Sequence, residues 1–322
     1  MTSFKQRAFL SLLSDSELRP AAFQLSNISS DLPSLLGNEA FKALLSSLPC
    51  FSSGETPEGL AGAEQLKALG VQTIVPNQIS PLSSVSDERP AGAVYFSGEW
   101  FLAPLPGPAK NQVASRSMAL KLVQLVAAEA DNHEIEDVFR REPTLSYHLL
   151  RLVNSPAIGN GRRIDSFAQA IILLGRRQLR RWLNLLLFSA AKNDPRSAML
   201  LAHVTARART MEQLAHLAGQ DKDEQERAFM AGMFSLLGAL FGQPLAEVIE
   251  PLKLEKSLNE ALLERNGLHG TLLNACEAIE RGQMELVDES LTGLLAAGSE
   301  IDVLRIEALL WTLTLLKESP ND

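Results

Sequence analysis

The spacing of hydrophobic residues changes character near residue 105. Beyond that point, apolar residues recur every three or four positions in successive segments, which is the spacing of amphipathic helices. The clearest segments are 117–130, 135–142, 144–155, 166–175, 176–191, 200–219, 257–267, 271–282 and 301–318. The connections between them are short and no sequence period repeats, so the pattern predicts a helical bundle rather than a solenoid.

One segment of this region, residues 228–242, carries no charge over fifteen positions. A helix of that length reaches about 22 Å, which is short of the roughly 30 Å hydrocarbon core of a bilayer. The segment also contains three glycines, is followed by Pro244, and has acidic rather than basic flanks. We therefore expect a buried core helix and no membrane association.

The first hundred residues alternate short apolar runs with one helical pattern. Runs at 21–25, 71–76 and 92–106 have strand length, and residues 55–70 read as a helix that ends at Gly70. This alternation predicts a small α/β domain. Three prolines and a glycine within residues 104–109 mark the boundary.

The predicted fold class is therefore mainly α. An α/β domain at 1–105 precedes a helical domain at 106–322. The net charge of -8 argues against a general nucleic-acid coat, and two distant cysteines form neither a disulfide framework nor a zinc cluster. The amino terminus lacks the layout of a secretory signal, so we expect a cytoplasmic protein.

Residues 139–190 resemble the HDOD domain, a helical signalling module of bacteria related to the metal-dependent HD phosphohydrolases. The pairs Asn154-Ser155 and Leu174-Gly175 follow the family order and spacing, and the looser resemblance extends over about 108–310. Both pairs also have structural reasons. Ser155 precedes a proline, which ends helices, and a glycine at 175 can take the left-handed cap of a helix.

In catalytic HD relatives, adjacent His and Asp residues in the helix corresponding to 228–242 hold a metal. This sequence has Ser235 and Leu236 there, while His203 and His269 resemble other metal histidines. Leucine offers no lone pair and serine replaces imidazole poorly. The resemblance thus implies vestigial positions, no metal or other cofactor, no catalytic residue, and no enzyme.

Two pieces of the first hundred residues resemble the end of an EAL domain, the TIM-type barrel that hydrolyses cyclic di-GMP. Residues 54–76 and 92–106 carry this resemblance. About 105 residues cannot supply eight βα units, so the resemblance implies a truncated, degenerate, partial TIM-barrel-like domain. The letters E-A-F at 39–41 lie in a helical pattern and are a chance match to the E-A-L motif.

Residues 151–181 hold seven arginines and one acid. Arg176, Arg177, Arg180 and Arg181 crowd the start of one predicted helix, and Arg162 and Arg163 precede it, so an anion should compensate them. The candidates are the protein's own acids, for instance at 277–300, an acidic protein partner, or a phosphate-bearing molecule such as a nucleotide second messenger or nucleic acid.

The leading hypothesis is a noncatalytic bacterial signal-transduction protein whose HDOD domain binds a protein of its pathway. Two alternatives stay open: a receptor for cyclic di-GMP or another nucleotide without hydrolysis, and a residual metal-dependent phosphohydrolase that uses His203 and His269. The sequence identifies neither the protein partner nor the oligomeric state. A homodimer is one of the possible oligomeric states.

Overall fold

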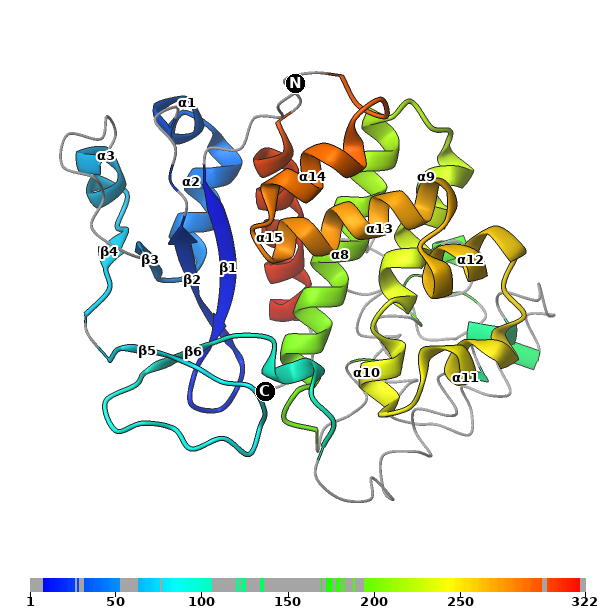
Figure 1. The fold of residues 1–322 in the computed structure, drawn as a ribbon, viewed down its shortest axis with the longest axis horizontal. Coiled ribbons are helices and arrows are strands. Elements are labelled where there is room, and N and C mark those ends of the chain that lie inside the picture. Colours follow the sequence, from blue (N-terminus) through cyan, green and yellow to red (C-terminus); the bar gives the residue numbers. More distant parts are fainter. Residues whose placement is uncertain are drawn as a thin grey trace.

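The computed structural model describes most of the amino-terminal and carboxyl-terminal thirds of the chain (Figure 1). The described residues are 8–26, 28, 32–52, 63–75, 77–105, 120–121, 123–125, 134–135, 169, 172–175, 178–179, 181, 183, 188, 194–296 and 300–318.

Six strands of the amino-terminal part form one mixed sheet in the order β4-β3-β2-β1-β6-β5. They are β1 (Phe9–Ser14), β2 (Pro20–Ser26), β3 (Cys50–Ser52), β4 (Gln72–Thr73), β5 (Ile79–Pro81) and β6 (Tyr95–Ser97). Strand β1 runs antiparallel to both neighbours, whereas β2-β3-β4 and β5-β6 are parallel. The predicted α/β character is confirmed, and β1 is a strand that the sequence patterns did not indicate.

The sheet is strongly curved. Strands β4 and β5 lie at opposite edges, yet only residues 74–78 connect them. Such a connection spans about 20 Å, whereas the outer strands of a flat six-stranded sheet lie about 24 Å apart. The sheet therefore curls into an open half-barrel.

The expected strands at 71–76 and 92–106 are much shorter in the structure. The first is reduced to β4, and the second ends at Ser97 before the 3-10 helix η1 (Trp100–Leu102). Gly98 causes this break, because its φ is +100° and a Cβ there would lie 2.5 Å from the Leu82 carbonyl oxygen. Only glycine fits such a turn.

Short helices connect the strands: α1 (Leu32–Leu36), α2 (Glu39–Ser47) and α3 (Ala63–Ala68). Helix α2 begins at a good cap, since the Asn38 side chain accepts a hydrogen bond from the Phe41 backbone N–H at 3.0 Å. Glu39 to Phe41 are thus helical, as the sequence predicted. The predicted stop at Gly70 is also confirmed, with φ at +87° just beyond α3.

The rest of the described chain is helical apart from its turns. The elements are α8 (Ser197–Leu217), α9 (Lys222–Phe234), α10 (Leu237–Phe241), α11 (Leu245–Ile249), η2 (Glu250–Leu252), α12 (Lys256–Glu264), α13 (Gly267–Glu280), α14 (Met284–Leu291) and α15 (Ile301–Glu318). The long α8 lies against α9, α13 and α15 (Figure 1). This arrangement confirms the helices expected at 200–219, 257–267, 271–282 and 301–318.

The prediction of a single helix over 228–242 is wrong. Helix α9 ends at Phe234, and α10 starts only at Leu237. The break has a local cause, because the Ser235 hydroxyl donates to the Gly232 carbonyl at 2.7 Å and competes with the helical backbone pattern. The predicted burial is confirmed for residues 228–234, all of which are buried.

No single helix in the described ranges is long and apolar enough to cross a bilayer. Residues Lys222–Phe241 and Leu245–Leu252 reach that length only as a pair bent by 115°.

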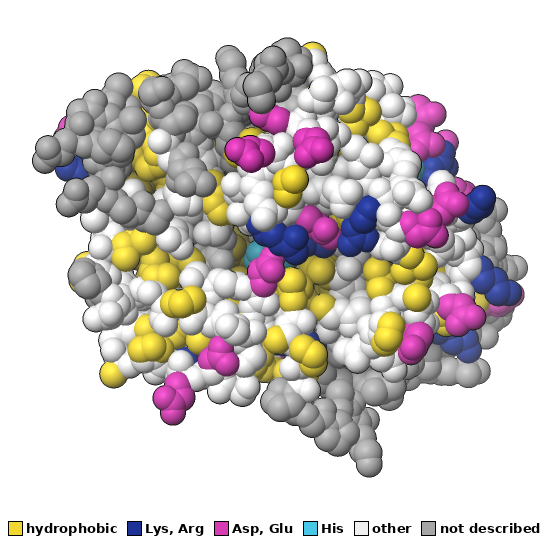
Figure 2. All heavy atoms as spheres, viewed as in Figure 1, with side chains coloured by type: hydrophobic (Ala, Val, Ile, Leu, Met, Phe, Trp, Pro, Cys, Tyr) yellow, Lys and Arg dark blue, Asp and Glu magenta, His cyan; other side chains and the backbone are white. Residues whose placement is uncertain are grey.

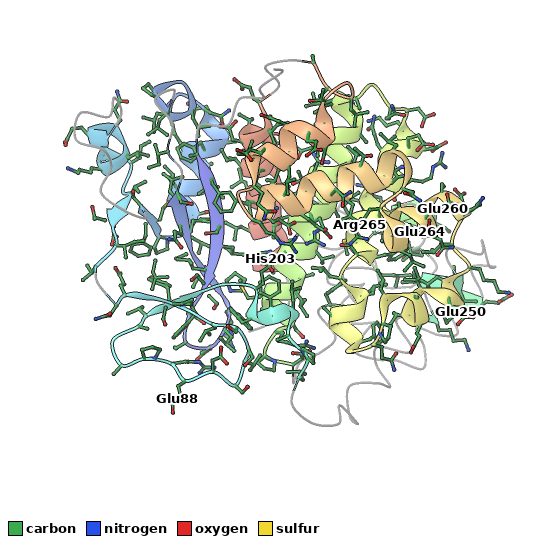
Figure 3. All side chains as sticks on the ribbon, in the orientation of Figure 1. Glu88, His203, Glu250, Glu260, Glu264 and Arg265 are labelled. Atoms are coloured by element: carbon green, nitrogen blue, oxygen red, sulfur yellow. The ribbon has the colours of Figure 1, made fainter. Side chains whose placement is uncertain are left out.

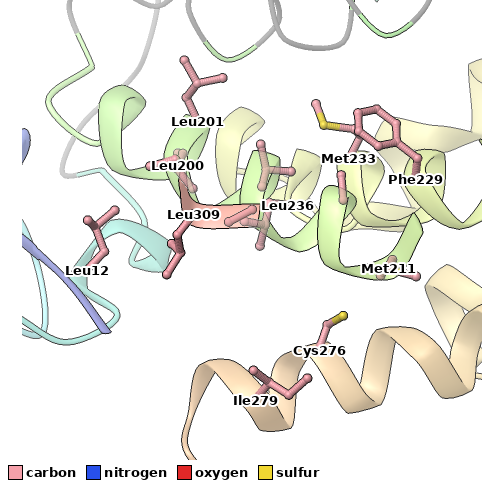
Figure 4. Close-up of a cluster of buried hydrophobic side chains, with 14 of the residues drawn as sticks. Leu12, Leu200, Leu201, Met211, Phe229, Met233, Leu236, Cys276, Ile279 and Leu309 are labelled. Carbon is pink, nitrogen blue, oxygen red and sulfur yellow. The ribbon is translucent and has the colours of Figure 1, made fainter. Parts of the chain in front are cut away.

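One hydrophobic core runs through both parts of the molecule. Figure 4 shows Leu12 of β1 beside residues of the helical part that include Leu200 of α8, Ile279 of α13 and Leu309 of α15. Helix α2 of the sheet region also packs on α15. The sheet region and the described helices therefore share their interior.

Candidate functional site

His203, one of the expected vestigial metal positions, lies on α8 where this helix meets η1 (Figure 3). Its imidazole ring stacks on the Phe101 ring, with centroids 4.2 Å apart. Burial lowers the pKa of His203 to about 4, against the attraction of Glu280. The imidazole is therefore neutral at physiological pH and packs as an aromatic ring.

A buried charge cluster lies next to His203. We call Arg207, Glu280, Arg305 and Ser235 the Arg207 cluster. The Arg207 guanidinium donates to both Glu280 carboxylate oxygens, Nε at 3.0 Å and Nη2 at 2.6 Å. Its Nη1 donates to the Ser235 hydroxyl at 2.9 Å, and Arg305 Nη1 lies 4.0 Å from Glu280.

The cluster is almost closed to solvent, with Arg207, Glu280 and Arg305 side chains only 6–7% exposed. Burial alone would raise the pKa of Glu280, but the neighbouring Arg207, together with Arg305, lowers it to about 2. The same pairing raises the pKa of Arg207 despite its burial. Arg207 and Glu280 thus form a buried, charge-assisted ion pair, and Glu277, 3.6 Å from Arg207, supplies a second carboxylate nearby.

Ser235 and Leu236 have structural roles at the end of α9. The Ser235 hydroxyl accepts from Arg207 and donates to Gly232, so both of its hydrogen-bonding directions are used. Leu236 is 6% exposed and packs in the core (Figure 4). Both side chains are thus engaged with neighbouring parts of the protein.

His269 lies apart from this cluster. It sits in the first turn of α13, and its Nε2 is 3.0 Å from Glu224 at the start of α9. Eleven helical residues, about 16 Å of axis, separate Glu224 from Ser235 at the other end of α9. The structure therefore brings His203, Ser235 and Leu236 into one neighbourhood and leaves His269 outside it. Burial lowers the pKa of His269, opposed by Glu224.

Within the described ranges, no group of three or more His, Cys, Asp and Glu side chains could hold a metal ion.

Comparison with known proteins shows which family this helical region resembles. The family model of the HDOD domain matches residues 114–265, a stretch that includes α8 to α12. The chain contains an HDOD domain.

Among the proteins similar to this chain are two curated sequences and a solved structure. Cyclic di-GMP phosphodiesterase CdgJ of Vibrio cholerae is 30% identical over 229 residues, 70% of this chain and 52% of that protein. Uncharacterized protein YuxH of Bacillus subtilis is 25% identical over 170 residues, 52% and 41% respectively. The chain thus spans about half the length of these curated relatives.

The solved structure is an HDOD domain protein of unknown function from Geobacter sulfurreducens. It is 16% identical, and the match covers 68% of this chain and 95% of that one with a TM-score of 0.40.

Of the HDOD motif pairs, Leu174-Gly175 lies within the described residues. Leu174 is 8% exposed, and Gly175 has φ at +69°, so the left-handed conformation expected of this glycine is confirmed. Asn154-Ser155 lies outside the described residues. The prediction for that pair therefore stays a prediction.

The one described arginine of the expected anion-binding patch, Arg181, is compensated internally. Its Nη2 donates to Glu212 at 2.6 Å, its Nε donates to Glu226 at 2.8 Å, and its guanidinium lies over the Phe229 ring. The side chain is 16% exposed. For Arg181 the compensating anions are thus two carboxylates of the same protein, Glu212 and Glu226, which agrees with the alternative that the protein's own acids compensate the arginines. The remaining arginines, Arg162, Arg163, Arg176, Arg177 and Arg180, lie outside the described residues.

The suggestion that acids at 277–300 compensate the patch is wrong for Arg181. Glu280 pairs with Arg207, and Glu277 accepts from Arg265 at 3.0 Å. On the face of the molecule drawn in Figure 2, acidic and basic side chains are interleaved over α12 and α13. Glu277 and Glu280 therefore pair with arginines of the carboxyl-terminal half of the chain.

The sequence patterns missed the Arg207 cluster entirely. A signal was present, because Arg207 stands within "HVTARART", where Val204 lies one helical turn earlier and Arg207 is flanked by the small residues Ala206 and Ala208. A charged residue on the apolar face of a predicted helix requires a buried partner. The sequence could not identify that partner, since Glu280 lies 73 residues away.

Proposed function

We propose that this HDOD protein is a noncatalytic bacterial signal-transduction module that acts by binding another protein. The observation that carries the proposal is the hydrogen bond from Arg207 to Ser235. A guanidinium occupies the neighbourhood in which the HD resemblance would require a divalent cation. A cation bound at Ser235 would face this fixed positive charge a few ångströms away in a low-dielectric interior.

The neighbouring positions support the same proposal. His203 is covered by Phe101, Leu236 belongs to the core, and Glu280 already binds Arg207 through both carboxylate oxygens. Water activation by a metal needs an open coordination position. Because Glu280 and Ser235 are committed to Arg207, this arrangement favours a structural over a catalytic role.

The Vibrio cholerae relative is named a cyclic di-GMP phosphodiesterase. We propose that the present chain works in second-messenger signalling of that kind as a regulator and not as the hydrolase. The half-barrel sheet fits a truncated EAL-like domain in its parallel pairs and curvature. Its β1 runs antiparallel to both neighbours, which differs from an all-parallel barrel.

A hydrolysis assay tests the noncatalytic proposal. We expect the purified full chain, incubated with cyclic di-GMP and Mn²⁺, to release product no faster than buffer with Mn²⁺. Metal analysis of the same preparation should find no stoichiometric transition metal. Turnover that requires metal, is lost in His203→Ala and persists in His216→Ala, a change on the same helix, would overturn the proposal.

A capture experiment tests the protein-binding part. Lysate proteins recovered by the wild-type chain should be lost in the Arg176→Ala/Arg177→Ala/Arg180→Ala variant, which leaves the internally paired Arg181 intact. The matched control, Lys42→Ala/Lys67→Ala/Lys256→Ala, also removes three cations, all from substantially exposed side chains. Equal recovery by all three proteins would remove the arginines from the binding surface.

A further inference from the structure

A cavity of about 460 Å³ lies between helices α9 and α12 (Figure 1). Its walls come from one side of α9, from η2, from the start of α12 and from residues 123–125. The Gln124 side chain donates to the Pro251 carbonyl at 3.1 Å and joins two of these walls. A cavity of this size lies within the range of small-molecule sites.

Most of the buried wall of this cavity is apolar. The apolar lining residues that are less than a tenth exposed are Val123, Met230, Phe234, Leu252 and Leu258. They come from four separate segments of the chain and border one common space. Protein interiors rarely leave voids larger than a water molecule, and a larger void costs stability because its lining lacks packing partners. An apolar ligand in the cavity would supply those contacts.

The charged residues around the cavity cancel one another. Two acids and two bases line it: Glu226, Glu255, Arg227 and Lys253. Glu226 Oε2 accepts from Arg181 Nε at 2.8 Å, so this acid is already paired. The Arg227 guanidinium lies 2.6 Å from Glu224 and 4.0 Å from Glu255. The lining therefore offers no net charge to an ionic ligand.

This balance bears on the ligand. A charged group that leaves water for an apolar site costs free energy unless an opposite charge compensates it. A carboxylate ligand would lie near Glu226 and Glu255 as well as near the two cations. An ammonium ligand would likewise lie near Arg227 and Lys253. An uncharged ligand avoids both repulsions.

We propose that this cavity binds an uncharged, predominantly apolar molecule of about ten to sixteen carbon atoms, such as a medium-chain alcohol or a two-ring aromatic compound. The size follows from the volume, since a cavity of about 150 Å³ holds benzene and this one is about three times larger. None of the described lining residues belongs to the Arg207 cluster. The proposal is therefore independent of the proposed function.

Displacement of the uncharged fluorophore phenylnaphthylamine from the full chain tests the proposal. The competitors are decanol, decanoate and decylammonium, which share one alkyl chain and differ in the charge of the head group. We expect decanol to compete at a concentration about tenfold or more below that of either ion. Stronger competition by either ion would overturn the assignment of an uncharged ligand. If the fluorophore shows no saturable binding, the site itself is wrong.

Leu254→Trp tests whether the fluorophore lies in this cavity. Leu254 lines the cavity and is only half-buried, so a larger ring can reduce the volume without overfilling the core. We expect fluorophore binding to weaken about tenfold while the melting temperature stays unchanged. The matched control is Leu263→Trp, because Leu263 is an exposed residue of α12 outside the lining, and it should bind as the wild type does.

Leu258→Ala supplies a second variant with the opposite effect on volume. It enlarges the cavity, so the preference for decanol should shift towards dodecanol. A change in chain-length preference is a readout that reduced stability alone does not produce. Equal weakening in Leu254→Trp and Leu263→Trp, or unchanged binding in Leu254→Trp without a shift in Leu258→Ala, would place the bound molecule outside the cavity and overturn the proposal.

Discussion

Replacing Arg207 with methionine is expected to lower the free energy of unfolding by about 3–5 kcal/mol. The substitution leaves the buried Glu280 carboxylate with only Arg305, 4.0 Å away, and removes the donor to Ser235. Chemical denaturation of both proteins at pH 7 measures the effect. The control is Arg209→Met on the same helix, whose pair with Glu212 is partly exposed, so a loss below about 1 kcal/mol is expected.

The same pair of proteins should respond differently to acid. The folded-state pKa of Glu280, about 2, lies below its ordinary value of 4.5. A carboxylate whose pKa is depressed by folding stabilises the protein above its unfolded pKa, and this stabilisation is lost as the pH falls from about 4.5 towards 2. The stability difference between wild type and Arg207→Met should therefore narrow over that window. A difference that stays constant from pH 7 to 3 would contradict the assigned pairing.

Replacing all three charged members of the cluster tests whether Arg207→Met lowers the stability because it leaves a buried charge without a close partner. In Arg207→Met/Glu280→Leu/Arg305→Met no charge remains buried without a partner. Apolar replacement of whole buried ion clusters is often neutral or stabilising. The triple variant should thus recover most of the stability lost in the single one.

Replacing Gly232 with alanine is expected to destabilise the protein by about 3 kcal/mol. A Cβ at this position would lie 2.5 Å from the Ala208 Cα and 2.8 Å from the Ala208 nitrogen, so α8 and α9 would have to move apart. Helix propensity alone predicts the opposite sign, a gain of about 1 kcal/mol. Thermal and denaturant unfolding curves decide between the two signs.

Ala208→Gly provides the matched test of this clash. The nearest atoms belong to the Ala208 backbone and not to its side chain, which lies 3.1 Å away. Adding Ala208→Gly to Gly232→Ala should therefore fail to restore stability. Full recovery of stability in the double variant would mean that the added Cβ at position 232 clashes with the Ala208 side chain and not with the Ala208 backbone.

Long-range periodicity explains which helices could be predicted. Residues 200–219 and 301–318 repeat their apolar positions over five turns, and both form helices close to the expected bounds. The break between α9 and α10 was not visible, because it depends on one serine that bonds to its own backbone. Helix α14 is short and half of its residues are polar, so its apolar spacing does not distinguish it from a surface loop.

Strand β1 and the Arg207 cluster could not be predicted, because both depend on contacts between residues that are distant in the sequence. Strand β1 contains apolar residues at four of six positions, a run too short to separate from other patterns, and its role depends on pairing with β2 and β6. The Arg207 cluster joins residues from α8, α9, α13 and α15. Local sequence indicates that a buried arginine needs a partner, but only the packing of distant helices selects it.

Arg196 joins the helical part of the chain to the end of the sheet region. Arg196, 1% exposed at the start of α8, pairs with Asp194 through two hydrogen bonds and donates to the Ala103 carbonyl at 2.7 Å. Together with the shared core, this contact joins the sheet directly to the described helices. A helical fragment cut near residue 105 would lose the acceptor side of that joint and uncover the α15 surface on which α2 packs. Any signal that loosens the half-barrel would then reach α8 through the polypeptide itself.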